Sequence, residues 1–86
     1  HCNRSREAAE ALKAEIVGQG GRAAVVAADL AQADAVAGLV EAARTALGPL
    51  TLLVNNASTF APDEVETLDA AGWDRQFAVN LKTPAF

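Results

Sequence analysis

The stretch LTLLVNNASTF, residues 50–60, changes abruptly from apolar to polar. Leu50–Val54 is an almost unbroken apolar run, and it follows Gly48 and Pro49, which end a preceding helix. Such a run is typical of a strand buried on both faces of a parallel sheet, although periodicity alone leaves a short buried helix open. In open α/β sheets, ligands bind just past the carboxyl ends of strands. The polar residues 55–59 are therefore the first candidates for a binding site.

The segments before and after this stretch alternate between helix and strand patterns. Apolar residues at every fourth position predict a helix that is capped by Ser5 and stopped by Gly18, and the run Ala23–Ala28 predicts a strand. A second apolar stripe predicts a helix over about Gln32–Leu47, and a last helix is expected from a Thr67 cap onward. This alternation predicts βαβ units and a parallel sheet.

The composition limits the class of protein. The 86 residues allow one small domain, and 51% hydrophobic with 21% charged residues is typical of a globular chain. A net charge of −4 disfavours nucleic acids and anionic membrane surfaces as partners, and no apolar run reaches the ~18 residues of a membrane span. Cys2 is the only cysteine, which indicates a reducing compartment, so we expect a cytoplasmic protein. Because the chain starts with His1 and not Met, we expect it to come from within a longer protein.

The start of the first helix is a candidate anion site. Asn3, Arg4 and Ser5 place an amide, a guanidinium and a hydroxyl side by side, and a helix amino end adds free N–H donors. No acid stands there to hold a ribose diol and repel a phosphate. Taken alone, the triplet is more often a capped and solvated helix start.

Single residues elsewhere leave two interpretations open. Asp29 follows a predicted strand and could bind a ligand or begin the next helix. Phe60 could stack on a flat ligand or fill the core, and Asn80, on the apolar face of the last helix, could be functional or a structurally satisfied amide. No group of residues has metal-ligand spacing, and with His1 at the chain end as the single histidine, no Ser–His–acid triad can be proposed.

Taken together and in order, Asp29-Leu30, Asn55-Asn56-Ala57-Ser58, and Asn80 within VNLKTPAF resemble the short-chain dehydrogenase/reductase family. Ser58 stands where the family usually has glycine. The resemblance spans essentially the whole chain. It implies a Rossmann-type doubly wound parallel sheet, of which residues 1–86 would form a partial, central portion of a single NADP-binding domain.

The variants HCNRS and NNAS, with Phe60 two residues later, look like the pteridine reductase branch of that family. The resemblance implies that Arg4 and Ser5 receive the 2′-phosphate of NADPH and that Phe60 stacks on the pterin ring. Asn80 would take the family's catalytic asparagine role and hold a water of the proton relay. The other implied NADP(H)-binding residues are His1 and Asn3 near the ribose, Asp29 and Leu30 at the adenine, and Asn56, Ala57 and Ser58 on the ribose and nicotinamide side.

The chain lacks three parts that the family pattern requires. The glycine-rich phosphate loop would precede His1, and the catalytic serine and Tyr-x-x-x-Lys pair would follow Phe86; the chain contains no tyrosine. Carbonyl or imine reduction needs a proton donor, so we expect the 86-residue chain alone to be inactive. Its two predicted strands would be the third and fourth of the sheet, which are not neighbours, so we also expect it to be either part of a longer chain or a fragment unable to fold alone.

The predicted function of the intact protein is NADPH-dependent reduction of a pterin or a similar flat carbonyl or imine compound. The alternatives are a non-catalytic NADP-binding or scaffold protein of the same fold, and a different carbonyl or ketoacyl reductase of the family. The expected partners are a small-molecule substrate and a second copy of the chain, in a dimer or tetramer. The substrate's identity and the reaction direction stay open.

Overall fold

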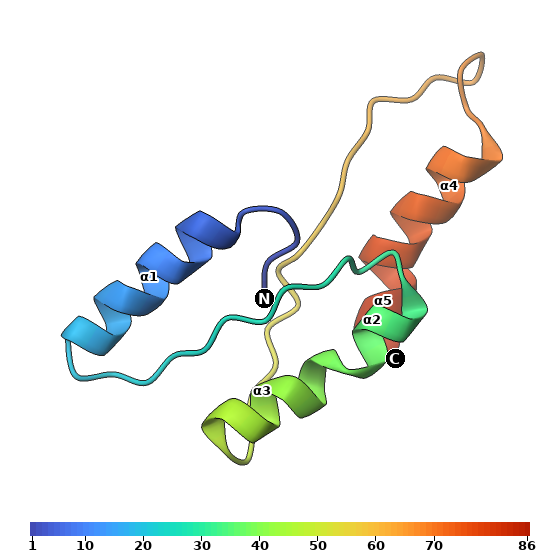
Figure 1. Cartoon of the computed structure of the whole chain (residues 1–86). Helices are drawn as coiled ribbons and strands as arrows, with labels where there is room; N and C mark the ends of the chain where they lie inside the picture. The colour runs from blue at the N-terminus through green and yellow to red at the C-terminus, as the bar shows by residue number, and fades with distance from the viewer. The chain divides into compact units, whose positions relative to one another are not determined.

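The computed structural model describes all residues 1–86, and their contacts divide into two compact units, residues 1–53 and 54–86. Helices are the only regular secondary structure besides one isolated β-bridge (Figure 1). The elements in chain order are α1 (Arg6–Gly18), α2 (Ala33–Ala37), α3 (Leu39–Leu47), α4 (Ala70–Phe77), the π-helix η1 (Ala78–Lys82) and α5 (Thr83–Ala85).

The first helix, α1, confirms the sequence prediction. It begins directly after Ser5, although the Ser5 side chain makes no capping hydrogen bond. It ends at Gly18, and Gly20, at φ 85°, turns the chain in a conformation that favours glycine. The returning segment meets the amino end of the chain in a single parallel bridge between Cys2 and Ala27. This bridge buries Cys2 and places residues 1–5 beside the end of the predicted strand Ala23–Ala28.

The predicted helix over Gln32–Leu47 is two helices in the structure. Helix α2 ends before Gly38 and α3 begins after it, because glycine has the lowest helix propensity of any residue except proline. Helix α3 ends at Gly48, where φ is 93° and ψ is −162°, a combination open essentially to glycine alone. The Arg22 guanidinium donates a hydrogen bond of 3.1 Å to the Leu47 carbonyl oxygen and so satisfies one terminal acceptor of α3.

An exposed ion pair joins Glu41 and Arg44 on α3. Two hydrogen bonds, of 2.8 and 2.9 Å, connect the guanidinium to the two carboxylate oxygens. The hydrogen bond from Arg44 lowers the pKa of Glu41 below its ordinary value, and Glu41 raises the pKa of Arg44 in turn. The pair stabilises the charged form of both residues along one face of a short helix.

Neither predicted strand is a strand in this structure. Residues 23–28 contribute only the bridge at Ala27, and Leu50–Val54 runs as an open segment without ladder hydrogen bonds (Figure 1). Leu52 is 84% exposed and Leu53 71% exposed, so the predicted burial on two faces is also absent. The physical reason is that a strand exists only through pairing with a neighbour: only Cys2 pairs with residues 23–28, and no segment pairs with Leu50–Val54.

The second unit is built on one continuous helical run. Helix α4 passes directly into η1 and α5, and Pro84 lies in the first turn of α5, where its missing N–H is tolerated. The predicted Thr67 cap is wrong. Asp69 caps α4 by accepting a hydrogen bond of 2.6 Å from the Gly72 N–H, while Thr67 donates to Asp63 at 2.9 Å in the preceding turn.

No helix of the structure has the length and apolar character needed to cross a lipid bilayer.

Candidate functional site

Asn80 in η1 holds the backbone of Thr59 in the polar loop. Its Oδ1 accepts a hydrogen bond from the Thr59 N–H, and its Nδ2 donates one to the Thr59 carbonyl oxygen, both at 2.8 Å. An amide side chain is suited to this double contact because it carries one acceptor and one donor group. The contact connects two segments 21 residues apart and fixes the residue that precedes Phe60.

The helix around Asn80 is locally widened to π geometry. η1 covers Ala78–Lys82 and carries Val79, the one buried residue of the helical run. Single π turns within α-helices are rare and occur frequently at functional sites. The widened turn therefore coincides with the residue predicted to be catalytic.

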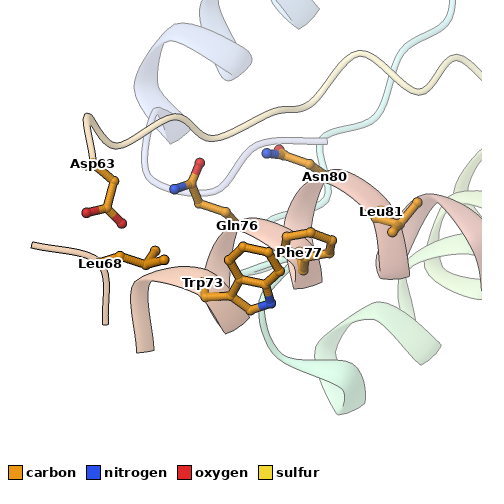
Figure 2. Close-up of a pocket in the computed structure, with 7 residues that line it drawn as sticks. All are labelled: Asp63, Leu68, Trp73, Gln76, Phe77, Asn80 and Leu81. Atoms are coloured by element: carbon orange, nitrogen blue, oxygen red, sulfur yellow. The ribbon is translucent and has the colours of Figure 1, made fainter. Parts of the chain in front are cut away.

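Two hollows flank this part of the second unit. One, of about 330 Å³, includes the predicted apolar stripe of the last helix, in which the Trp73 and Phe77 rings stack with centroids 4.4 Å apart (Figure 2). Asn80 lines the same hollow. The second, of about 600 Å³, lies under the loop and is lined by Phe60, Pro62, Asp63, Glu64, Thr67 and Gln76 among others.

Phe60 is exposed and not a core residue in this structure. Its side chain is 83% exposed and borders the second hollow. Asn56 and Ser58 are also exposed, and the Asn56 N–H donates to the Val54 carbonyl oxygen at 3.1 Å, which closes a tight turn at the start of the loop. An exposed aromatic face next to a fixed backbone can receive a flat ring.

In the first unit, the predicted cofactor residues gather at the amino end of α1. The His1 imidazole donates from Nε2 to the Ala28 carbonyl oxygen at 2.9 Å, which brings residues 1–5 beside Asp29. The side chains of Asn3, Arg4 and Ser5 are exposed and take part in no hydrogen bond or ion pair. Their polar groups are thus open to a ligand at a helix amino end.

Asp29 accepts a hydrogen bond of 3.0 Å from the Ala31 N–H. Asp29 therefore closes a local turn that includes Leu30, and it does not begin the next helix as the simpler interpretation from sequence predicted, because α2 starts at Ala33 after Gln32. No group of three or more His, Cys, Asp or Glu side chains is arranged to hold a metal ion.

Sequence reasoning missed two residues of the loop region. Thr59 acts through its backbone, so its side-chain type carries no signal. Gln76 lines both hollows and lies four residues before Asn80, which puts the two amides on the same side of the helical run. That spacing is the signal that could have identified Gln76.

The chain is similar to known proteins over nearly its whole length. The family model described as short chain dehydrogenase matches residues 1–86. An uncharacterized oxidoreductase of Methylorubrum extorquens is 38% identical over 77 residues, which cover 90% of this chain and 31% of that protein. The "inactive 2-(S)-hydroxypropyl-CoM dehydrogenase 2" of Xanthobacter autotrophicus is 40% identical over 79 residues, 92% of this chain and 33% of that protein.

A solved structure is more similar in sequence than these relatives. The crystal structure of FolM alternative dihydrofolate reductase 1 from Brucella canis, complexed with NADP, superposes with a TM-score of 0.92 at 54% identity. The match covers 99% of this chain and 34% of that protein. The chain thus spans about a third of the length of the proteins it matches. Because the family model covers it from His1 to Phe86, the chain belongs to the short-chain dehydrogenase/reductase family.

Proposed function

We propose that the intact protein is an NADPH-dependent short-chain oxidoreductase that reduces a pterin or a similar flat carbonyl or imine compound. The observation that carries this proposal is the double hydrogen bond of Asn80 to Thr59, which fixes the loop next to the exposed Phe60 ring. A flat substrate stacked on Phe60 would lie beside the residue predicted to be catalytic. The NADP complex of the FolM protein supports the choice of cofactor.

The residues at the start of α1 fit the 2′-phosphate of NADPH. The Arg4 guanidinium is exposed and unengaged, and a planar fork of donors suits phosphate oxygens. Ser5 makes no capping hydrogen bond, so its hydroxyl is free to donate to the same phosphate. His1 and Asn3 would contact the adjoining ribose, and Asp29 with Leu30 would border the adenine.

The remaining predicted residues would act at the reacting end of the cofactor. Bound NADPH supplies a hydride, and Asn56, Ala57 and Ser58 would line its ribose and nicotinamide side. Asn80 would hold a water that continues the proton relay. The chain contains no tyrosine, so the family's proton-donating tyrosine would come from outside these 86 residues, and the chain alone should show no reductase activity.

We also propose how these residues fit into the intact protein. Residues 1–86 would be one central part of a single NADP-binding domain with a doubly wound parallel sheet, in which neighbouring strands cover the exposed Leu50–Val54 segment. We also propose a homo-oligomer, a dimer or tetramer, and a cytoplasmic location. The single cysteine supports the reducing compartment.

A second function is favoured by one observation. The Xanthobacter relative, at 40% identity, carries the word "inactive" in its name, so the fold does not guarantee catalysis. The competing hypothesis is a non-catalytic NADP-binding or scaffold protein. A different carbonyl or ketoacyl reductase would share the cofactor and differ in substrate.

The test is a steady-state assay of the intact protein with NADPH and a 7,8-dihydropterin. We expect NADPH oxidation that depends on the dihydropterin, and a lower kcat/KM with NADH. Binding of NADPH without turnover of any dihydropterin, quinone or ketoacyl thioester would contradict the proposal and favour the non-catalytic protein. Turnover of ketoacyl thioesters alone would assign a different reductase.

A further inference from the structure

The Gln76 side chain lines the hollow next to Phe60, and its amide makes no hydrogen bond within the protein. It is half-buried, it lines both hollows of the second unit, and its side chain has no hydrogen-bond partner. Figure 2 shows the Gln76 and Asn80 side chains leaving the helix toward the loop, away from the Trp73 and Phe77 rings. The Gln76 amide therefore points toward the loop and makes no hydrogen bond within the protein.

The Asp63 carboxylate and the Thr67 hydroxyl, two other polar groups of that wall, already take part in hydrogen bonds. Asp63 Oδ1 accepts from the Thr67 hydroxyl at 2.9 Å and from the Glu64 N–H at 3.1 Å, and Thr67 Oγ1 accepts from the Glu64 N–H at 3.0 Å. These bonds form a closed turn. They leave Gln76 as the half-buried side chain of the hollow that can both donate to and accept from a ligand.

The position of Gln76 relative to Phe60 follows from the Asn80 contact. Asn80 fixes Thr59, Phe60 follows it, and Gln76 lies one helical turn before Asn80. A ring stacked on Phe60 would thus project a substituent into the hollow that Phe60 and Gln76 both line. The hollow carries the acids Asp63 and Glu64 and no basic side chain, which disfavours a carboxylate on that substituent.

We propose that Gln76 is a specificity-determining residue that hydrogen-bonds a neutral, hydroxylated substituent of the flat substrate. This inference rests on the proposed function, since it places the ring on Phe60. A hydroxyl both donates and accepts, so it can pair with either end of the Gln76 amide. Sites that hydrogen-bond a substrate hydroxyl reject analogues that lack it, because the site's polar group is then left unpaired.

The experiment compares two substrates of the intact protein that differ only in this substituent. The probes are a 7,8-dihydropterin with a hydroxylated propyl group at carbon 6 and the same ring with a methyl group there. Gln76→Leu removes the hydrogen bond at similar volume. We expect the ratio of kcat/KM between the hydroxylated and the methyl substrate to fall about 3- to 10-fold, chiefly through KM, as expected for one neutral hydrogen bond.

Two further variants separate specificity from structure. Gln76→Glu keeps an acceptor at the same position and should restore part of the ratio, whereas Gln19→Leu, a glutamine replacement after α1, should leave the ratio unchanged. An unchanged ratio in Gln76→Leu, or an equal loss on both substrates, would overturn the inference while dihydropterin reduction still supports the proposed function. If the unmodified protein reduces neither dihydropterin, the inference fails, whereas the proposed function fails only if quinones and other flat carbonyl compounds are not reduced either.

Discussion

The side-chain amide of Asn80 brackets the backbone of Thr59 with two hydrogen bonds of 2.8 Å, one accepted and one donated. These two hydrogen bonds hold the polar loop against the π-helical turn and so fix the backbone next to Phe60. A structurally satisfied amide and a catalytic amide are therefore compatible interpretations of the same residue. The bracket uses the side chain and leaves the Asn80 backbone carbonyl as a further acceptor for a water.

Asn80→Ala should loosen the loop and reduce activity. It removes both bonds to Thr59, and for an exposed pair we expect a loss of about 1 kcal/mol in local stability, with a fall in kcat on the order of tenfold or more from misplaced groups. The measurement pairs hydrogen exchange at the Thr59 amide with steady-state kinetics of the intact protein. If the Thr59 amide exchanges at the same rate in Asn80→Ala as in the unmodified protein, the two hydrogen bonds do not form in solution.

Arg4→Asp should change the cofactor preference from NADPH toward NADH. The 2′-phosphate would lose a charge-assisted hydrogen bond and meet a like charge, which we expect to lower the NADPH preference roughly 10- to 100-fold. The matched control is Arg6→Asp, because Arg6 lies two residues on and contacts Glu10 at 3.6 Å. If both variants changed the preference for NADPH over NADH equally, the cause would be the change in net charge and not a contact of Arg4 with the 2′-phosphate.

Phe60→Ala should weaken binding of a dihydropterin. Loss of ring stacking and of apolar contact area costs about 1–2 kcal/mol, so we expect KM to rise on the order of tenfold while the Kd for NADPH stays the same. Phe60→Trp keeps an aromatic face and should retain much of the affinity. A dihydropterin KM that Phe60→Ala leaves unchanged counts against stacking.

Gly48→Ala should destabilise the protein, whereas Gly18→Ala should not. Gly48 has a backbone conformation that side chains adopt only at a cost of about 1–3 kcal/mol, although nothing lies within 4 Å of an added Cβ. Gly18 is helical and also has open space, so alanine there should stabilise by about 0.4–1 kcal/mol. Denaturant unfolding of the two variants of the intact protein measures the difference, and equal shifts would contradict the assigned turn.

The pKa of Glu41 should depend on Arg44. Because the guanidinium lowers this pKa in the folded state, the pair stabilises the fold above the unfolded pKa of Glu41 and loses that contribution as the pH falls through the folded pKa. In Arg44→Gln we expect the pKa of Glu41 to rise toward its ordinary value, as followed by NMR titration of the carboxyl carbon. Arg75→Gln, on another helix, should leave it in place.

The sequence by itself determined the helices and the positions of the candidate residues. Apolar spacing predicted α1 and the last helix, since a helix satisfies its backbone hydrogen bonds within its own segment. Three motifs together indicated the family, which the family model confirms over the whole chain: Asp29-Leu30, Asn55-Asn56-Ala57-Ser58, and Asn80 within VNLKTPAF. These features depend on neighbours at most four residues away or on residue type alone.

Tertiary structure decided the strands and the use of Asn80. The predicted strands are not formed, because a strand needs a partner segment and none pairs with Leu50–Val54 in this structure. The bracket between Asn80 and Thr59 likewise joins residues 21 positions apart. Pairing at such a distance depends on how the chain turns between the partners, which local sequence patterns do not encode.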